Sequence, residues 1–196
     1  MAQAVGHPLL ATGIASLALD LPYHGERATT GGVMPRNPMA LVGAWRSALA
    51  EARAAVSWLA VQTEVDRERI GVIGYSLGGF LALRTASDEP RLRVVALAAA
   101  GDLPDQLPYA SLVRGAVDPL KAAKRIGGRP LMLLNGRRDT TTRPAQAERL
   151  FASAQEPKSL VWYDGGHWPP PAAIGQLVAW LATELRALDA GGQRSA

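Results

Sequence analysis

Ser76 is the residue whose surroundings most clearly indicate chemistry, because it lies inside the stretch Gly74–Gly79, which reads GYSLGG. The apolar run Ile70–Tyr75 leads into this stretch and predicts a strand, while a helical pattern begins near Phe80. A G-x-S-x-G pattern between a strand and a helix is typical of a nucleophile elbow, a sharp turn that lifts a serine hydroxyl out of the sheet. The sequence therefore predicts that Ser76 is a nucleophile.

The residues beside this serine fit the same prediction. Glycine is expected at Gly74 and Gly78, because side chains there would collide with neighbouring backbone in so tight a turn. The helix that begins behind the serine directs its N-terminal dipole and its free N–H groups at developing negative charge. We therefore predict that the backbone N–H of Leu77 is one donor of an oxyanion hole.

A serine hydroxyl needs a general base, and the 3 histidines of the chain are the candidates. Of His7, His24 and His167, only the last follows the serine in the chain. It lies in the segment 164–168, just after a predicted strand over Leu160–Tyr163, where two glycines allow the chain to fold back over the sheet edge. We predict that His167 is the base. The two earlier histidines are not expected to act in catalysis.

The base in turn needs an acid that orients it, and such an acid should follow another strand end. Asp139 meets this requirement, since it stands four residues beyond the predicted strand Leu131–Asn135. Asp102 is the alternative, placed after the predicted strand Arg93–Ala99. We favour Asp139 on strand-end geometry, which gives the chain order serine, aspartate, histidine. Asp164 is too near the histidine along the chain and is expected at most to hold its loop.

These side chains must be positioned by a sheet, and the chain alternates short apolar runs with longer helical patterns. That alternation is typical of a parallel sheet flanked by helices. Helical spacing of apolar residues is clearest over 45–59 and 174–188. The predicted strands, most of which read as the nearly continuous apolar runs of strands buried on both faces, are Ile14–Leu19, Ile70–Tyr75, Arg93–Ala99, Leu131–Asn135 and Leu160–Tyr163.

The composition excludes several other classes of protein. With 196 residues the chain has the length of one α/β domain, which we expect over residues 1–188 with a disordered tail over 189–196. A content of 48% hydrophobic and 19% charged residues argues against disorder. Because cysteine is absent, disulfides, a thiol nucleophile and cysteine-containing metal sites are excluded. The net charge of +4 comes from scattered arginines rather than a basic patch, so nucleic-acid binding is not expected.

The sequence shows neither a membrane span nor a convincing secretory signal. The apolar stretch Leu9–Leu21 lacks a preceding lysine or arginine, and Asp20 and Pro22 close it. No apolar run of the sequence approaches the roughly 20 residues that a spanning helix needs. We therefore expect a cytoplasmic protein that does not bind membranes.

These motifs resemble those of α/β-hydrolases, and most closely the dienelactone-hydrolase-like and acyl-esterase-like branches. The resemblance is carried by the segments 19–27, 66–79, 129–139 and 158–167, so it spans nearly the whole chain. It implies a three-layer, doubly wound and mostly parallel α/β sheet. True dienelactone hydrolases carry a cysteine nucleophile where this chain has Ser76, so the resemblance favours a carboxylester hydrolase.

One part of the family pattern is not found in the sequence. Such folds supply a His-Gly-rich loop after an early strand, and that loop donates the second oxyanion N–H. Residues Pro8–Gly13 resemble instead the helix that follows this loop, so the resemblance implies an N-terminally shortened fold. Either the natural protein is longer, which we favour, or this hydrolase has impaired chemistry. The loss of the third family strand is expected to leave a gap between Ile14–Leu19 and Ile70–Tyr75, or to force these two segments to pair.

The sequence thus predicts a serine hydrolase that cleaves a carboxylic ester through an acyl-enzyme, with Ser76, Asp139 and His167 as the triad. The expected partner is a small-molecule ester, and no metal or organic cofactor is expected. Tyr75 and Trp168 are candidate substrate-binding residues, with core packing as the alternative for each. Two other functions stay open, namely a peptidase or acyltransferase on the same triad and a non-catalytic hydrolase-fold protein without the oxyanion loop. The sequence does not indicate an oligomeric state.

Overall fold

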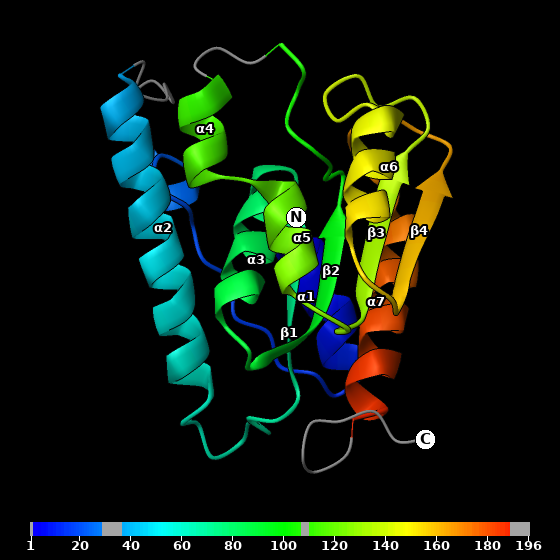
Figure 1. Ribbon diagram of the computed structural model, residues 1–196. Coiled ribbons are helices and arrows are strands. Elements are labelled where there is room, and N and C mark those ends of the chain that lie inside the picture. The colour runs from blue at the N-terminus through cyan, green and yellow to red at the C-terminus, as the bar shows by residue number, and fades with distance from the viewer. Residues whose placement is uncertain (1, 29–36, 107–109, 189–196) are drawn as a thin grey trace.

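The computed structural model describes residues 2–28, 37–106 and 110–188, which are built around a parallel sheet (Figure 1). Within these residues, four strands are hydrogen-bonded in the order β1-β2-β3-β4, so each strand lies beside the next one in the chain. Parallel pairing of consecutive strands requires a crossover connection, and helices supply it. The strands are β1 (Ile70–Tyr75), β2 (Leu92–Ala98), β3 (Leu131–Gly136) and β4 (Lys158–Tyr163).

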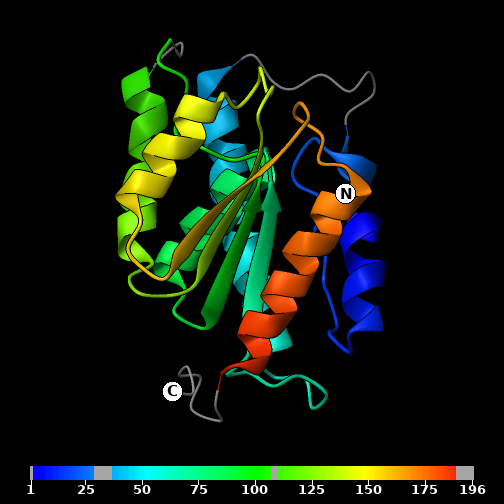
Figure 2. The same cartoon turned by 90° about the vertical axis from the view of Figure 1, so that its right-hand side faces the viewer.

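Helices cover both faces of this sheet. They are α1 (Ala2–Ala11), α2 (Pro38–Leu59), α3 (Leu77–Asp88), α4 (Ala110–Ala116), α5 (Pro119–Arg125), α6 (Pro144–Ser153) and α7 (Pro171–Arg186), with a short 3-10 helix at Gly25–Arg27. Buried side chains of α2, α3, α5 and α6 form one core cluster with alternate β2 residues such as Val95. Those of α1 and α7 form a second cluster on the opposite face with residues such as Val94. Figure 2 shows the sheet between these two helical layers, which confirms the expected three-layer α/β fold.

Four of the five strands expected from the sequence are confirmed, and their bounds differ from the expected ones by at most two residues. For β2 and β3 the reason is burial on both faces, since both strands are buried along almost their whole length. The helical pattern expected over 45–59 lies in α2, and the one expected over 174–188 lies in α7 except for its last two residues. The tail predicted over 189–196 lies outside the described residues.

The prediction of a fifth strand over Ile14–Leu19 is wrong. The segment forms no strand and is largely exposed, with Leu17 at 44% and Leu19 at 42% of their accessible surface. A cavity of about 870 Å³ is lined both by this segment and by β1 residues such as Val72. A strand needs a ladder of backbone hydrogen bonds to a neighbour, and β1 pairs only with β2 in the described sheet. Of the two outcomes expected here, the structure therefore shows the gap.

The C-terminal ends of the parallel strands meet at one edge of the sheet, at the top of Figure 1. Helix α4 lies at the same end, where the indole N–H of Trp45 in α2 donates to the Ala116 carbonyl at 3.2 Å. Open α/β sheets bind ligands outside these strand ends, so this edge is the place to look for a site. None of the helices in the described part of the chain combines the length and the apolar character needed to cross a membrane.

Candidate active site

Ser76 occupies the turn between β1 and α3, and its backbone is strained. Its φ of 50° and ψ of −116° lie in a region that non-glycine residues rarely adopt. The Ser76 N–H donates to the Ala98 carbonyl at 2.9 Å, which attaches the turn to the end of β2. Gly74 permits this turn, because a Cβ there would lie 2.7 Å from the Ala82 Cβ and closer still to the Gly78 carbonyl. The local geometry is that of a nucleophile elbow.

The expectation that Gly78 itself would be crowded is wrong. A Cβ at this position would meet no heavy atom within 4 Å outside its own helical turn, so lack of space does not explain the glycine. The crowded position is Gly79, where a Cβ would lie 2.8 Å from the Ala100 Cβ. The first turn of α3 therefore packs closely against the chain that follows β2.

The structure brings three predicted side chains together from the ends of three different strands. Ser76 follows β1, Asp139 follows β3 and His167 follows β4. The serine Oγ lies 2.8 Å from His167 Nε2, and Asp139 Oδ2 lies 2.8 Å from His167 Nδ1. The tautomer that satisfies both bonds carries its proton on Nδ1, where it donates to the carboxylate, and accepts from the serine hydroxyl at Nε2. A chain of groups linked in this way can move a proton from the serine to the histidine.

The carboxylate of Asp139 is fully buried, and the backbone of its own turn holds it. Its Oδ1 accepts hydrogen bonds from the N–H groups of Thr141 at 2.8 Å and Thr142 at 2.9 Å. These bonds leave Oδ2 for His167. The sequence interpretation did not single out the two threonines. The signal that could have found them is an aspartate at the start of a polar turn, where such side-chain to backbone bonds are common.

A tyrosine at the end of β4 supports the loop that carries His167. Tyr163 is buried, and its hydroxyl donates to the Gly166 carbonyl at 2.8 Å. Burial, together with the negative charge of Asp139, raises the pKa of Tyr163 to about 12. Asp164, in the same loop, forms an ion pair with Arg138, as expected of a residue that holds the loop.

Replacing Tyr163 with phenylalanine is expected to lower the free energy of unfolding by about 1 kcal/mol at neutral pH, because one hydrogen bond to the loop is lost. The raised pKa means that the neutral phenol contributes stability that is complete below pH 10 and is lost as the pH rises through about 12. The variant should therefore lose less stability than the wild type between pH 10 and 12. Urea titrations at constant ionic strength check this, and parallel losses in both proteins would contradict it.

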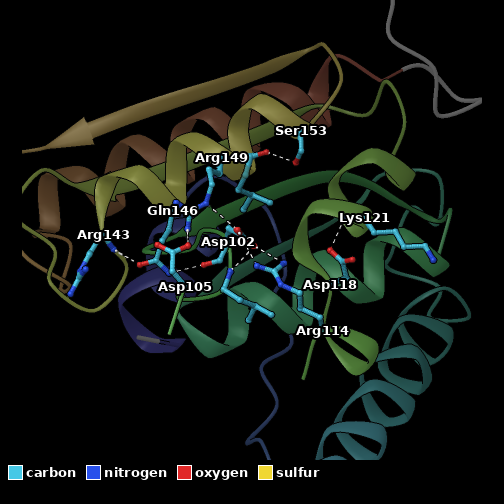
Figure 3. Close-up of polar contacts among 11 residues, drawn as sticks. Asp102, Asp105, Arg114, Asp118, Lys121, Arg143, Gln146, Arg149 and Ser153 are labelled. Atoms are coloured by element: carbon cyan, nitrogen blue, oxygen red, sulfur yellow. Dashed lines mark hydrogen bonds and ion pairs between the residues drawn. The ribbon is translucent and has the colours of Figure 1, made fainter. Parts of the chain in front are cut away.

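The alternative acid, Asp102, lies in a separate cluster of ion pairs (Figure 3). Its side chain is 4% exposed and pairs with Arg114 of α4 at 3.2 Å and with Arg149 of α6 at 3.0 Å. The hydrogen bond that Arg114 donates to the Asp102 carboxylate raises the pKa of the Arg114 guanidinium. The structure thus places Asp139, and not Asp102, against His167.

Tyr75 and Trp168 form a row of aromatic rings beside His167. The Tyr75 ring centre lies 5.3 Å from that of the imidazole and 5.0 Å from that of Trp168, on which it is stacked. Burial raises the pKa of Tyr75, whose ring packs against the core cluster formed with α7. Trp168 is 70% exposed. Tyr75 therefore packs against the core and also lines the cavity that Ser76 lines, while Trp168 presents an open aromatic surface.

The first turn of α3 offers backbone donors next to the serine. Leu77 is the first residue of α3, so its N–H and that of Gly78 have no acceptor within the helix. The positive end of the helix dipole lies at the same place. The Leu77 side chain is 39% exposed and lines the same cavity as Ser76. These donors lie next to the serine in the chain, at the helix end that favours negative charge.

With this geometry in view, comparison with known proteins identifies the class: the chain belongs to the alpha/beta hydrolase family. The model of that family matches residues 2–129. An uncharacterized protein of Mycobacterium tuberculosis is 33% identical over 138 residues, which cover 66% of this chain and 48% of that protein. A carboxymethylenebutenolidase of Rhodococcus opacus is 37% identical over 105 residues, which cover 52% of this chain and 39% of that protein. The chain spans half or less of the length of these relatives.

Solved structures share the fold over most of the chain. A cold-adapted esterase from an Arctic intertidal metagenomic library matches with a TM-score of 0.70 and 22% identity, over 93% of this chain and 74% of the esterase. A monoacylglycerol lipase of Paleococcus ferrophilus matches with a TM-score of 0.69 and 18% identity, over 93% of this chain and 89% of the lipase. At such identities the likeness shows the α/β-hydrolase fold alone.

Proposed function

We propose that this protein is a serine hydrolase that cleaves a carboxylic ester through an acyl-enzyme. The observation that carries the proposal is the pair of 2.8 Å hydrogen bonds that link Ser76 Oγ through His167 to the buried Asp139. Membership of the alpha/beta hydrolase family supports it. The names of several matched proteins, which include an esterase and a monoacylglycerol lipase, agree with an ester as the substrate.

The proposed reaction begins when Ser76 Oγ attacks the carbonyl carbon of the ester and His167 Nε2 takes the hydroxyl proton. The tetrahedral intermediate then breaks its bond to the alcohol oxygen, and the alcohol leaves with the proton from the imidazolium. Water attacks the resulting acyl-enzyme, and His167 takes a proton from that water. The carboxylic acid departs as this proton returns to Ser76 Oγ. Asp139 keeps the imidazole oriented and stabilises its charged form.

The backbone N–H of Leu77 is the proposed donor to the oxyanion that forms in both steps. It stands at the N-terminus of α3, directly after the strained serine, and is unpaired within the helix. A donor aimed at the oxyanion stabilises the intermediate more than the neutral carbonyl of the substrate. One such donor contributes roughly 10²–10³ to kcat.

The experiment that tests this function is intact-mass spectrometry after incubation with a fluorophosphonate. Because such a probe reacts with activated serines, one adduct is expected on the wild type, and none on Ser76→Ala or His167→Ala. Circular dichroism on all three proteins shows that each is folded. No adduct on a folded wild type would contradict the proposal and favour a non-catalytic protein. Turnover of matched ester and amide substrates then separates an esterase from a peptidase.

Replacing Trp168 with alanine is expected to raise KM for aryl esters about three- to tenfold, with little change in kcat. The reason is that its ring is exposed and stacks on Tyr75, whose ring lies beside the imidazole, so it can stack on a flat group of a bound substrate. Steady-state kinetics on an aryl and an alkyl ester of the same acid measure this. Trp58→Ala is the matched control, because Trp58 is also an exposed tryptophan but lies at the end of α2. Equal KM values for the two variants would contradict the prediction.

A further inference from the structure

The chain that follows β2, residues Ala99–Asp102, is a buried segment that we call the β2 corner. Ala99 has a φ of 49°, a left-handed conformation that is strained for a non-glycine residue. Ala99 and Ala100 are 0% and 1% exposed, so water cannot satisfy their backbone groups. A strained and buried backbone persists only where surrounding groups hold it. The contacts of the β2 corner therefore show what it positions.

On one side the β2 corner touches the turn that carries the nucleophile. The N–H of Ser76 donates to the carbonyl of Ala98, the residue directly before the corner, at 2.9 Å. Ala100 lies so close to Gly79 of α3 that a Cβ on this glycine would be 2.8 Å from the Ala100 Cβ. Any shift of the β2 corner would therefore move the backbone that sets the position of Ser76.

On the other side the β2 corner is bonded to the turn that carries the acid. The Thr142 hydroxyl donates to the Ala99 carbonyl at 3.0 Å, and the Thr142 N–H donates to Asp139 Oδ1 at 2.9 Å. The side-chain amide of the fully buried Asn135 donates to the Ala100 carbonyl at 3.0 Å. Thr142 thus holds the acid with its backbone and the β2 corner with its side chain.

Asp102 anchors the end of the β2 corner to α6, the helix that begins directly after the acid turn (Figure 3). The Asp102 N–H donates to the Gln146 carbonyl at 2.9 Å, and the Gln146 side-chain amide donates back to the Asp102 carbonyl at 2.7 Å. Arg149 of α6 adds an ion pair to the Asp102 carboxylate at 3.0 Å. These contacts join the β2 corner to α6, close to where the Thr142 hydroxyl joins it to the acid turn. They therefore hold Thr142 close to Ala99.

From these contacts we infer that Thr142 is a positioning residue, whose hydroxyl ties the acid turn to the β2 corner and so fixes His167 relative to Ser76. The inference rests on the proposed function. The hydroxyl touches no reacting atom and acts through the Ala99 carbonyl. Without it, this buried carbonyl loses a donor and the left-handed corner loses a restraint. Reacting groups misplaced by about 1 Å can cost about 10²-fold in rate.

The test compares Thr142→Val, which keeps the shape and the backbone N–H, with Thr142→Ser, which keeps the hydroxyl. Thr141→Val is the matched control, because Thr141 also donates its N–H to Asp139 while its side chain is exposed. The kcat is measured per active site titrated with a fluorophosphonate, so unfolded molecules do not count. We expect Thr142→Val to lower kcat about ten- to one-hundredfold at nearly constant KM. Thr142→Ser should restore most of it, and Thr141→Val should match the wild type.

A second readout does not depend on turnover. The proton between His167 Nδ1 and Asp139 gives a far-downfield signal in a one-dimensional proton spectrum, and its loss in His167→Gln identifies it. We expect faster exchange of this proton with water to weaken the signal in Thr142→Val but not in Thr142→Ser or Thr141→Val. A wild type that does not react with the fluorophosphonate overturns the proposed function, and the proton signal then decides the positioning by itself. Equal kcat values in the wild type and Thr142→Val overturn the inference. If the wild type shows no turnover, equal proton signals in these two proteins overturn it.

Discussion

Replacing Ser76 with alanine is expected to lower kcat for ester hydrolysis by about 10⁴-fold or more, with KM little changed. The change removes the only atom that can form the acyl-enzyme in the proposed reaction, while the backbone donor at Leu77 remains. Burst-phase and steady-state kinetics on an aryl ester measure the loss. Residue 76 has a strained φ of 50°, and alanine must adopt the same strained backbone as the serine. The free energy of unfolding should therefore change little.

The histidine supplies the control for this prediction. Ser76 and His167 act as one unit through their 2.8 Å hydrogen bond, so their losses should not add. The double variant Ser76→Ala with His167→Ala is expected to be about as slow as either single variant. A Ser76→Ala protein that retains a tenth or more of the activity, roughly, would show that another residue carries the reaction.

Replacing Asp139 with asparagine is expected to lower kcat by about 10⁴-fold. The amide has nearly the same shape as the carboxylate, but it favours the wrong tautomer of His167 and does not stabilise the imidazolium. The carboxylate is fully buried and accepts two backbone N–H groups at Oδ1, so it is held by bonds other than the one to His167. Rates of fluorophosphonate labelling and of ester turnover should fall together.

Asp102→Asn is the matched control, because Asp102 is the other acid that follows a strand end. Its carboxylate pairs with Arg114 and Arg149 rather than with the histidine. We expect this change to lower the free energy of unfolding by about 1–3 kcal/mol, since a buried charged acceptor is lost, and to leave kcat per titrated site within about tenfold. A large loss of kcat in Asp102→Asn with a small one in Asp139→Asn would reverse the assignment of the acid.

Features of the site that depend on one short stretch of chain were predictable from the sequence. The stretch Gly74–Gly79 predicted a strand, a sharp turn and a helix, because the space needed at Gly74 is a local demand of that turn. The four strands were predictable because each contains a run of apolar residues. β2 and β3 are buried along almost their whole length, while β1 and β4 are mostly half-buried. His167 and Asp139 were predictable as candidates because each follows such a segment.

The choice between the two acids depended on which strands are neighbours. β4 pairs with β3, with Tyr163 opposite Gly136, so the loop that carries His167 lies beside the turn that carries Asp139. The end of β2, from which Asp102 follows, is one strand further away. Both acids follow strand ends in the sequence, which favoured Asp139 but left Asp102 as an alternative. The order of strands in the sheet decides between them.

By itself the sequence determined the nucleophile turn, the apolar strands and a short set of candidate acids and bases, because those depend on neighbouring residues. The tertiary structure decided what depends on distant partners. The apolar run Ile14–Leu19 is no strand, since hydrogen bonds from another strand are needed and β1 lies across a cavity. Ala99 adopts a left-handed backbone although the sequence has no glycine at this position. Thr142, 43 residues away, holds it. Strand pairing and a strained backbone both depend on contacts between segments that are distant in the sequence. Such contacts exist only once the chain has folded.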